Sequence, residues 1–193
     1  MTVPPSLLIG SDHLPRCAWA GSDLEYQRYH DEEWGTPLLG DRQVFEKISL
    51  EGFQAGLSWI TILRRRPAFR AAFSDFDIDR VAAMTPDDVE RLVLDASIIR
   101  HRGKIEAVIG NARVTQRLGD SLSDLVWSFR PAAGRARPQR LSDIPAVTPE
   151  STALSVELRR RGYRFVGPTT MYALMQSAGL VDDHVTGCWR AVA

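Results

Sequence analysis

The stretch Ile98-Ile99-Arg100-His101-Arg102-Gly103 lies between two segments with strong helical signals. Before it, Thr85-Pro86-Asp87-Asp88 is typical of a helix start, because a threonine cap precedes a proline and two carboxylates in the first turn. After it, the residues from about Lys104 to Leu118 predict a second helix. An apolar pair and a glycine in so short a link predict a tight turn between two packed helices.

Two interpretations of this turn stay open from its residues alone. Arg100, His101 and Arg102 give it a basic rim, and in an ordinary helical hairpin such a rim simply faces water. In a helix-hairpin-helix, the exposed backbone N–H groups and the N-terminus of the second helix hold a DNA phosphate instead. Gly103 and Lys104 would then belong to the DNA-binding surface together with the three basic-rim residues.

Helical signals also dominate the rest of the chain. Asp41 is predicted to cap a helix whose apolar residues recur near the 3.6-residue period. Thr148-Pro149-Glu150 predicts another helix start, and Pro168 opens a further helix that closes near Gly179. The best candidate for a strand is the short segment Tyr163 to Val166. The predicted fold class is all-α.

The overall composition is that of an ordinary globular protein. Of the 193 residues, 44% are hydrophobic and 25% are charged, and no apolar run reaches the roughly 18–20 residues of a membrane-spanning helix. Residues 1–15 lack the basic and apolar blocks of a signal peptide and are predicted to form a disordered tail. We therefore expect one helical domain over residues 16–193, with the hairpin at about 86–118, a cytoplasmic location and no membrane partner.

The formal net charge is zero, because 24 basic and 24 acidic side chains cancel. A neutral protein is at first sight a poor partner for nucleic acid, since phosphate binding usually leaves a basic footprint. The charges are unevenly distributed, however. Residues 1–60 carry 4 basic and 9 acidic side chains, whereas residues 61–193 carry 20 and 15. A positive local field over the second part of the chain therefore survives the zero total.

Four residues suggest a metal site that joins the two ends of the chain. Cys17 and His30 lie near the N-terminus, and His184 with Cys188 has a spacing of four that brings both side chains to one turn. Two thiolates and two imidazoles form a closed tetrahedral set for zinc. Two buried cysteines beside two unrelated histidines remain the alternative. A site with four protein ligands would be structural, since no position is left for an activated water.

A carboxylate stands inside the otherwise apolar run from Leu50 to Trp59. Glu51 is followed there by glycines at 52 and 56, which favour a helix end or a close approach to the backbone. Aromatic residues are dense around His30, namely Trp19, Tyr26, Tyr29 and Trp34. In one interpretation the aromatic rings fill the core and Glu51 faces water. In the other they form a stacking pocket with one buried acceptor, which suits a flat cationic or hydrogen-bond-donating ligand.

Taken together, these segments closely resemble the DNA-3-methyladenine glycosylase I family, over about residues 16–188. The segments that carry the resemblance are Arg16-Cys17-Ala18-Trp19, Tyr29-His30-Asp31-Glu32-Glu33-Trp34-Gly35, Leu50-Glu51-Gly52, Gln54-Ala55-Gly56-Leu57-Ser58-Trp59-Ile60-Thr61, Ile98-Ile99-Arg100-His101-Arg102-Gly103-Lys104-Ile105, Arg161-Gly162-Tyr163-Arg164-Phe165-Val166-Gly167 and Asp182-Asp183-His184-Val185-Thr186-Gly187-Cys188. The resemblance implies a helix-hairpin-helix glycosylase fold. It also implies one structural zinc ion per chain, which would join the N- and C-terminal regions through Cys17, His30, His184 and Cys188.

The same resemblance implies a pocket for an extruded base. Tyr29 and Trp59 correspond to its stacking walls, and Glu51 corresponds to the catalytic carboxylate that hydrogen-bonds the adenine. Trp19 and Trp34 belong to the aromatic surroundings of the base.

On the DNA side, Leu57 is a candidate wedge that fills the gap left by the extruded base. The hairpin residues Arg100, His101, Arg102, Gly103 and Lys104 are the expected phosphate contacts.

The implied activity is that of a monofunctional DNA repair glycosylase. We expect a monomer that binds double-stranded DNA containing 3-methyladenine, excises the base by hydrolysis and leaves an abasic site without a lyase step. A non-catalytic binder of alkylated DNA on the same scaffold is the alternative. A zinc hydrolase unrelated to DNA is a third hypothesis, which a closed four-ligand metal site would exclude.

Overall fold

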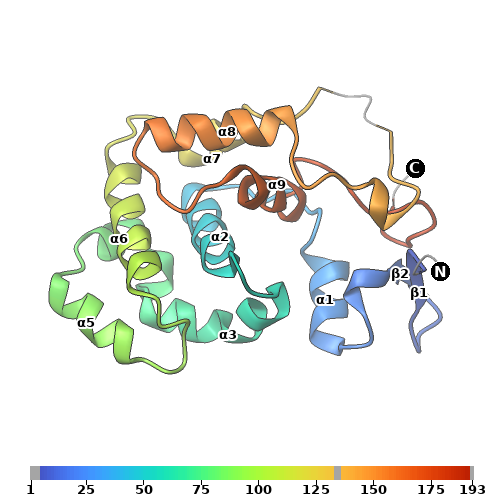
Figure 1. Cartoon of the computed structure of the whole chain (residues 1–193), viewed down its shortest axis with the longest axis horizontal. Coiled ribbons are helices and arrows are strands. Elements are labelled where there is room, and N and C mark those ends of the chain that lie inside the picture. Colours follow the sequence, from blue (N-terminus) through green and yellow to red (C-terminus); the bar gives the residue numbers. More distant parts are fainter. Residues whose placement is uncertain (1–4, 133–135, 192–193) are drawn as a thin grey trace.

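Helices make up most of the protein in its computed structural model, which describes residues 5–132 and 136–191 (Figure 1). The α-helices are α1 (Leu24–Glu32), α2 (Asp41–Gln54), α3 (Trp59–Ala72), α4 (Ile78–Ala82), α5 (Pro86–Leu94), α6 (Arg102–Gln116), α7 (Leu122–Trp127), α8 (Pro149–Arg160) and α9 (Pro168–Ser177). The other elements are the strands β1 (Leu7–Ile9) and β2 (Pro15–Cys17) and the 3₁₀ helices Ala18–Ala20, Ser74–Phe76 and Leu141–Asp143. Within the described ranges, none of the helices has the combined length and apolar character needed to cross a bilayer.

The N-terminal segment differs from the disordered tail expected over residues 1–15. Strand β1 pairs with β2 in antiparallel register, with Leu7 opposite Cys17, so the expectation was wrong for this part, while residues 1–4 lie outside the described residues. A two-stranded hairpin is marginal on its own. Here the C-terminal segment supports it, because the backbone N–H of Trp189 donates to the carbonyl of Pro15 at 2.8 Å. The all-α prediction is corrected accordingly to a mostly helical fold with one small hairpin.

Helix α2 runs through the centre of the molecule (Figure 1). It packs against α3, α6, α7 and α9, and every residue from Lys47 to Phe53 is buried. A helix segment that is buried all round belongs to the core, and its apolar positions supply much of the burial that stabilises the fold. Any polar side chain on this part of α2 therefore lies inside the protein.

The start of α2 differs from the sequence prediction. Gly40 is the N-cap residue, and Asp41 is the first residue of the helix. The Asp41 carboxylate accepts hydrogen bonds from the Ser121 hydroxyl (2.6 Å) and the Ser123 N–H (2.9 Å) at the start of α7. Asp41 thus ties two helices together across 80 residues of sequence, which no local pattern could have indicated.

The two helices predicted on either side of the basic turn form as α5 and α6. Thr85 and Asp88 form a reciprocal capping box at the start of α5, and Thr148 does the same with Ser151 at the start of α8. The strand expected over Tyr163 to Val166 does not form. These residues make a turn between α8 and α9, because the Asn111 side chain of α6 binds both the N–H (2.9 Å) and the carbonyl (3.1 Å) of Arg164.

Gly179 holds the end of α9 against the segment that leads into α2. Its φ is +75°, and a Cβ there would lie 2.7 Å from the backbone of Thr36 and of Pro37. Gly119 has the same φ but open space around it, so it is a matched control. Both alanine variants incur about 1–2 kcal/mol for the left-handed conformation. Because the added methyl group also overpacks the contact with Thr36 and Pro37, we expect the free energy of unfolding of Gly179→Ala to be about 2 kcal/mol lower than that of Gly119→Ala. Its melting temperature should then be roughly 4–8 °C below that of Gly119→Ala. Equal melting temperatures would contradict this assignment.

Candidate base pocket and Cys/His cluster

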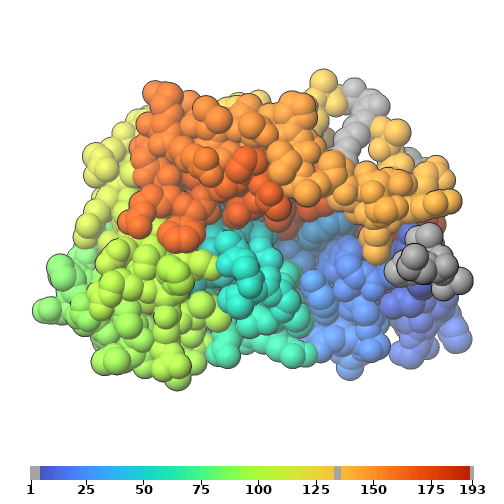
Figure 2. Space-filling model, in the orientation of Figure 1, coloured from blue at the N-terminus to red at the C-terminus, as the bar shows by residue number. Residues whose placement is uncertain are grey.

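An aromatic cavity of about 230 Å³ opens where three distant parts of the chain meet, with Ile144 added from a fourth. The segment leading into and through α1, the end of α2 with the start of α3, and helix α9 all contribute to its walls. In Figure 2 the corresponding blue, cyan and red segments meet near the middle of the face. The lining residues are Trp19, Tyr26, Tyr29, Trp34, Glu51, Gln54, Trp59, Ile144, Ala173, Gln176 and Ser177.

The two predicted stacking walls touch each other. The rings of Tyr29 and Trp59 have centroids 5.4 Å apart and planes tilted by 42°. A flat base held between two parallel rings would need about 7 Å, that is, two van der Waals contacts. Tyr29 and Trp59 are therefore adjacent sides of the cavity, and a base would lie against them. The indole N–H of Trp59 is buried without a partner among the described residues, which leaves a hydrogen-bond donor available to a ligand.

Glu51 is the carboxylate of this cavity, and it is buried, with 3% of its surface exposed. Among the described residues its hydrogen-bond partner is the Ser177 hydroxyl of α9, which donates at 3.2 Å. Burial raises the pKa of Glu51 to about 7, while the ammonium of Lys47 and the bond from Ser177 oppose that rise. A carboxyl group whose pKa lies near neutral pH can be ionised there, and among aromatic rings it can accept hydrogen bonds from a bound base and attract a positive charge.

The loop between α2 and α3 carries Leu57 beside the cavity. The backbone N–H of Leu57 donates to the carbonyl of Gln54 at 2.6 Å, and the Gln54 side chain donates to the carbonyl of Leu57 at 2.6 Å. Gly56 completes the turn with a φ of +86°. The Leu57 side chain is 39% exposed, as a residue that inserts into DNA would have to be.

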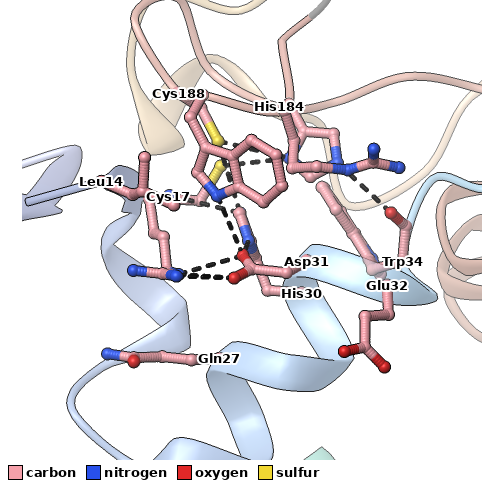
Figure 3. A network of polar contacts seen from close by, with 12 residues as sticks. Leu14, Cys17, Gln27, His30, Asp31, Glu32, Trp34, His184 and Cys188 are labelled. Carbon is pink, nitrogen blue, oxygen red and sulfur yellow. Dashed lines mark hydrogen bonds and ion pairs between the residues drawn. The ribbon is translucent and has the colours of Figure 1, made fainter. Parts of the chain in front are cut away.

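The four predicted metal ligands come together in the structure and are drawn in Figure 3. Cys17, His30, His184 and Cys188 are all buried, and their ligand atoms lie within 4.8 Å of one another. The Cys188 Sγ is 3.4 Å from His30 Nε2 and 3.6 Å from His184 Nδ1, and Cys17 Sγ is 3.8 Å from His184 Nδ1. Ligands at zinc distances of 2.0–2.3 Å around a tetrahedron are separated by about 3.3–3.8 Å. The cluster can therefore hold a tetrahedral metal ion.

One ring nitrogen of each histidine contacts a group outside the cluster, which directs the other nitrogen toward the two sulfur atoms. His30 Nδ1 contacts the Asp31 carboxylate at 2.7 Å, and Arg16 and Trp189 also donate to that carboxylate. His184 Nε2 contacts the carbonyl of Trp34 at 3.2 Å. Such outer partners fix the ring orientation and the tautomer of ligating histidines. His30 Nε2 and His184 Nδ1 face the sulfur atoms (Figure 3), and His30 Nε2 also accepts a long hydrogen bond of 3.4 Å from the Cys17 N–H.

The cluster and the cavity share walls. The Trp34 ring stacks on His30, with centroids 6.3 Å apart, and meets His184 edge-on at 4.7 Å. The Trp19 ring lies 5.1 Å from His30 and 5.0 Å from Trp34. Both tryptophans also line the cavity. Whatever orders the cluster therefore also orders one side of the cavity.

At the hairpin, the structure separates the predicted DNA contacts by role. The Arg100 side chain is exposed and has no partner among residues 5–132 and 136–191. His101 caps α6, because its Nδ1 accepts the Lys104 N–H at 3.2 Å, and Arg102 forms a bidentate pair with Glu90 at 2.7 Å. Gly103 stands in the first turn of α6, where backbone N–H groups are open to an anion.

Lys104 is the one predicted DNA contact that the structure places elsewhere. It is only 7% exposed, and its Nζ donates to the carbonyls of Phe53 (2.9 Å) and Ala55 (2.7 Å) at the end of α2. An ammonium group is a favourable partner for the orphan carbonyls and the negative dipole at a helix C-terminus. Lys104 therefore fixes the hairpin to the helix that carries Glu51, and we withdraw it from the phosphate contacts.

The sequence already indicated Tyr26 among the aromatic residues around His30, and Tyr26 does line the cavity. Other lining residues were not predicted. Gln176 and Ser177 had no local signal, because their place at the cavity depends on how α9 packs on α2.

Comparisons with known proteins identify the family of this chain. A family model described as methyladenine glycosylase matches residues 19–191. DNA-3-methyladenine glycosylase 1 of Escherichia coli K12 is 52% identical over 181 residues, which are 91% of this chain and 96% of that protein. A crystal structure of 3-methyladenine DNA glycosylase I matches with a TM-score of 0.87 and 50% identity, covering 91% of this chain and 98% of that one. The Staphylococcus aureus protein, solved for the structural basis of its 3-methyladenine recognition, matches with a TM-score of 0.83 and 36% identity, covering 90% and 94%.

Proposed function

Because this chain belongs to the methyladenine glycosylase family, we propose that it excises 3-methyladenine from alkylated DNA by hydrolysis and leaves an abasic site. The observation that carries the proposal is the burial of Glu51 in a cavity walled by aromatic rings. This combination suits a flat, positively charged base better than a neutral one.

Release of the methylated base does not require a strong general acid. Methylation at N3 gives the adenine in DNA a positive charge, so the base is already a good leaving group. The protein must extrude the nucleotide, bind the charged base and admit water to C1′. Ionised Glu51 would act by binding and electrostatic stabilisation, with the Trp59 and Tyr29 rings against the base. Leu57 would occupy the space that the base leaves in the duplex.

The metal site would be structural and occupied by zinc. Two thiolates and two imidazoles form a soft, closed donor set that matches zinc, and the three sulfur–nitrogen separations of 3.4, 3.6 and 3.8 Å lie in the tetrahedral range. Bound zinc would supply no reactive water but would hold β2 and α1 to the segment after α9. The cavity walls Trp19 and Trp34 rest on the same cluster.

Binding to the duplex would rest on few phosphate contacts. Arg100, the open N–H groups near Gly103 and, after its pair with Glu90 opens, Arg102 are the groups at the hairpin that can reach a phosphate. We therefore expect a monomer that binds undamaged double-stranded DNA weakly and with a shallow dependence on salt. Most of the selectivity would then come from the base cavity.

The test is to incubate the purified protein with methylated duplex DNA and to identify the released bases by chromatography. We expect free 3-methyladenine, an abasic product and no strand cleavage. Absence of free base at a large excess of protein would overturn the proposal. If lesion-dependent affinity remained in that case, the protein would be the non-catalytic binder of alkylated DNA instead.

A further inference from the structure

Lys47 is a buried cation of the cavity region that the proposed reaction does not use. It lies on α2 one helical turn before Glu51, and only 8% of its surface is exposed. Its Nζ donates to the Tyr29 hydroxyl at 2.9 Å and stands 4.8 Å and 4.4 Å from the ring centroids of Tyr29 and Trp59. An ammonium that loses its hydration in this way costs several kcal/mol unless other charges compensate it.

The anions around Lys47 come from two sides. Glu33 follows α1, and its carboxylate is held by both NH groups of Arg66 from α3, at 2.5 Å and 2.8 Å. Glu46 lies on α2 itself and binds Arg70 of α3 at 2.8 Å. Each of these carboxylates thus has a cation of its own.

Glu51 is the remaining anion near Lys47, and it has no ion pair among the described residues. It is held by a neutral hydroxyl, that of Ser177. Lys47 does not touch it, since the ammonium is bonded to Tyr29 instead. The two buried charges therefore act on each other through the interior of the protein, where screening by water is weak.

We propose that Lys47 is a positioning residue of the base pocket, whose ammonium keeps Glu51 ionised and, through the Tyr29 hydroxyl, holds the aromatic wall. The effect of Lys47 on base release rests on the proposed function, whereas its effect on the ionisation of Glu51 does not depend on any substrate. In this role Lys47 forms no bond to the substrate. Lys47 is not among the lining residues of the cavity, where a nucleophile for the sugar would have to be.

The directions of the pKa shifts agree with this role. Burial lowers the pKa of Lys47 to about 8, and Glu51 is the first of the charges that oppose the decrease. Burial raises the pKa of Glu51 to about 7, and Lys47 is the first of the groups that oppose the increase. At neutral pH the ammonium is therefore still protonated, and it favours the ionised form of Glu51. Without Lys47, protonated Glu51 would persist to a higher pH.

Three variants separate charge from shape. Lys47→Met removes the charge and keeps a long flexible side chain, Lys47→Gln also retains a group that can donate to Tyr29, and Lys47→Arg retains the charge. In carbon-13 NMR of the Glu carboxyl groups, the Glu51 signal is identified by its loss in Glu51→Gln. We expect its titration midpoint to rise by about one pH unit in Lys47→Met and Lys47→Gln and to return near wild type in Lys47→Arg, since a unit charge one helical turn away has about that effect.

The kinetic readout is the pH profile of kcat/KM for base release between pH 6 and 9, with metal content and circular dichroism checked for each variant. The pH below which kcat/KM declines should shift to a higher value in the uncharged variants, by the same amount as the NMR midpoint of Glu51. An unchanged Glu51 midpoint in both uncharged variants would overturn the proposal, as would a borohydride-trapped adduct with DNA that Lys47→Met abolishes. If wild-type protein releases no base, the proposed function fails while the NMR result still decides the role of Lys47.

Discussion

Glu51→Gln should lower kcat/KM for release of 3-methyladenine by about 10²-fold or more. Glutamine keeps the shape of the side chain and can still accept the hydrogen bond from Ser177. What it lacks is the negative charge that an ionised carboxylate presents to a cationic base. The loss should appear in single-turnover base release from methylated duplex DNA, with enzyme in excess.

The pH dependence of the wild type follows from the same carboxylate. Burial raises the pKa of Glu51 to about 7, so the group loses its charge as the pH falls through neutrality. We expect kcat/KM to decrease about tenfold per pH unit below about pH 7, because the free enzyme must be ionised to bind the lesion. In Glu51→Gln, kcat/KM should not show this decrease below about pH 7, because glutamine does not ionise.

A matched control shows whether the loss is specific. Asp41→Asn also converts a carboxylate of α2 to an amide, but Asp41 binds the start of α7 and lies outside the cavity. It should reduce the melting temperature and leave base release within a few-fold of wild type at 20 °C. Wild-type rates in Glu51→Gln would remove this carboxylate from the mechanism.

Removal of the metal should have the second largest effect, on stability rather than on chemistry. A metal that binds only the folded protein stabilises it by about 4 kcal/mol when its free concentration is 1,000 times Kd. For a chain of this length, that corresponds to a decrease of roughly 8–16 °C in melting temperature. We expect this decrease on chelation and in Cys188→Ser, measured by circular dichroism beside metal analysis.

Base release should decline with the metal, because Trp34 and Trp19 rest on the histidines of the cluster. Addition of chelator to Cys188→Ser is the control and should cause no further decrease in melting temperature. Less than about one metal ion per two chains in protein purified without chelators would contradict the site. An unchanged melting temperature after chelation would contradict it as well.

Features whose partners are neighbours in sequence could be predicted from the sequence. The threonine caps at Thr85 and Thr148 formed as predicted, since a cap binds an N–H three residues away. The hairpin from α5 to α6 formed for the same reason, because a short link leaves two adjacent helices few ways to pack. The Cys/His cluster was found in the sequence through its residue types and the family resemblance. Its convergence to ligand distance is a property of the fold.

Only the tertiary structure decided what the buried charges do. Lys104 was expected at the DNA but caps the end of α2, and Lys47 had no expected role but stands behind Tyr29 and near Glu51. No local pattern around either lysine in the sequence indicated these partners. Their partners lie in other segments, and an ammonium group takes its function from the carbonyls, rings and carboxylates that packing brings within a few ångströms, because electrostatic interactions in a buried site depend on distance and on the exclusion of water.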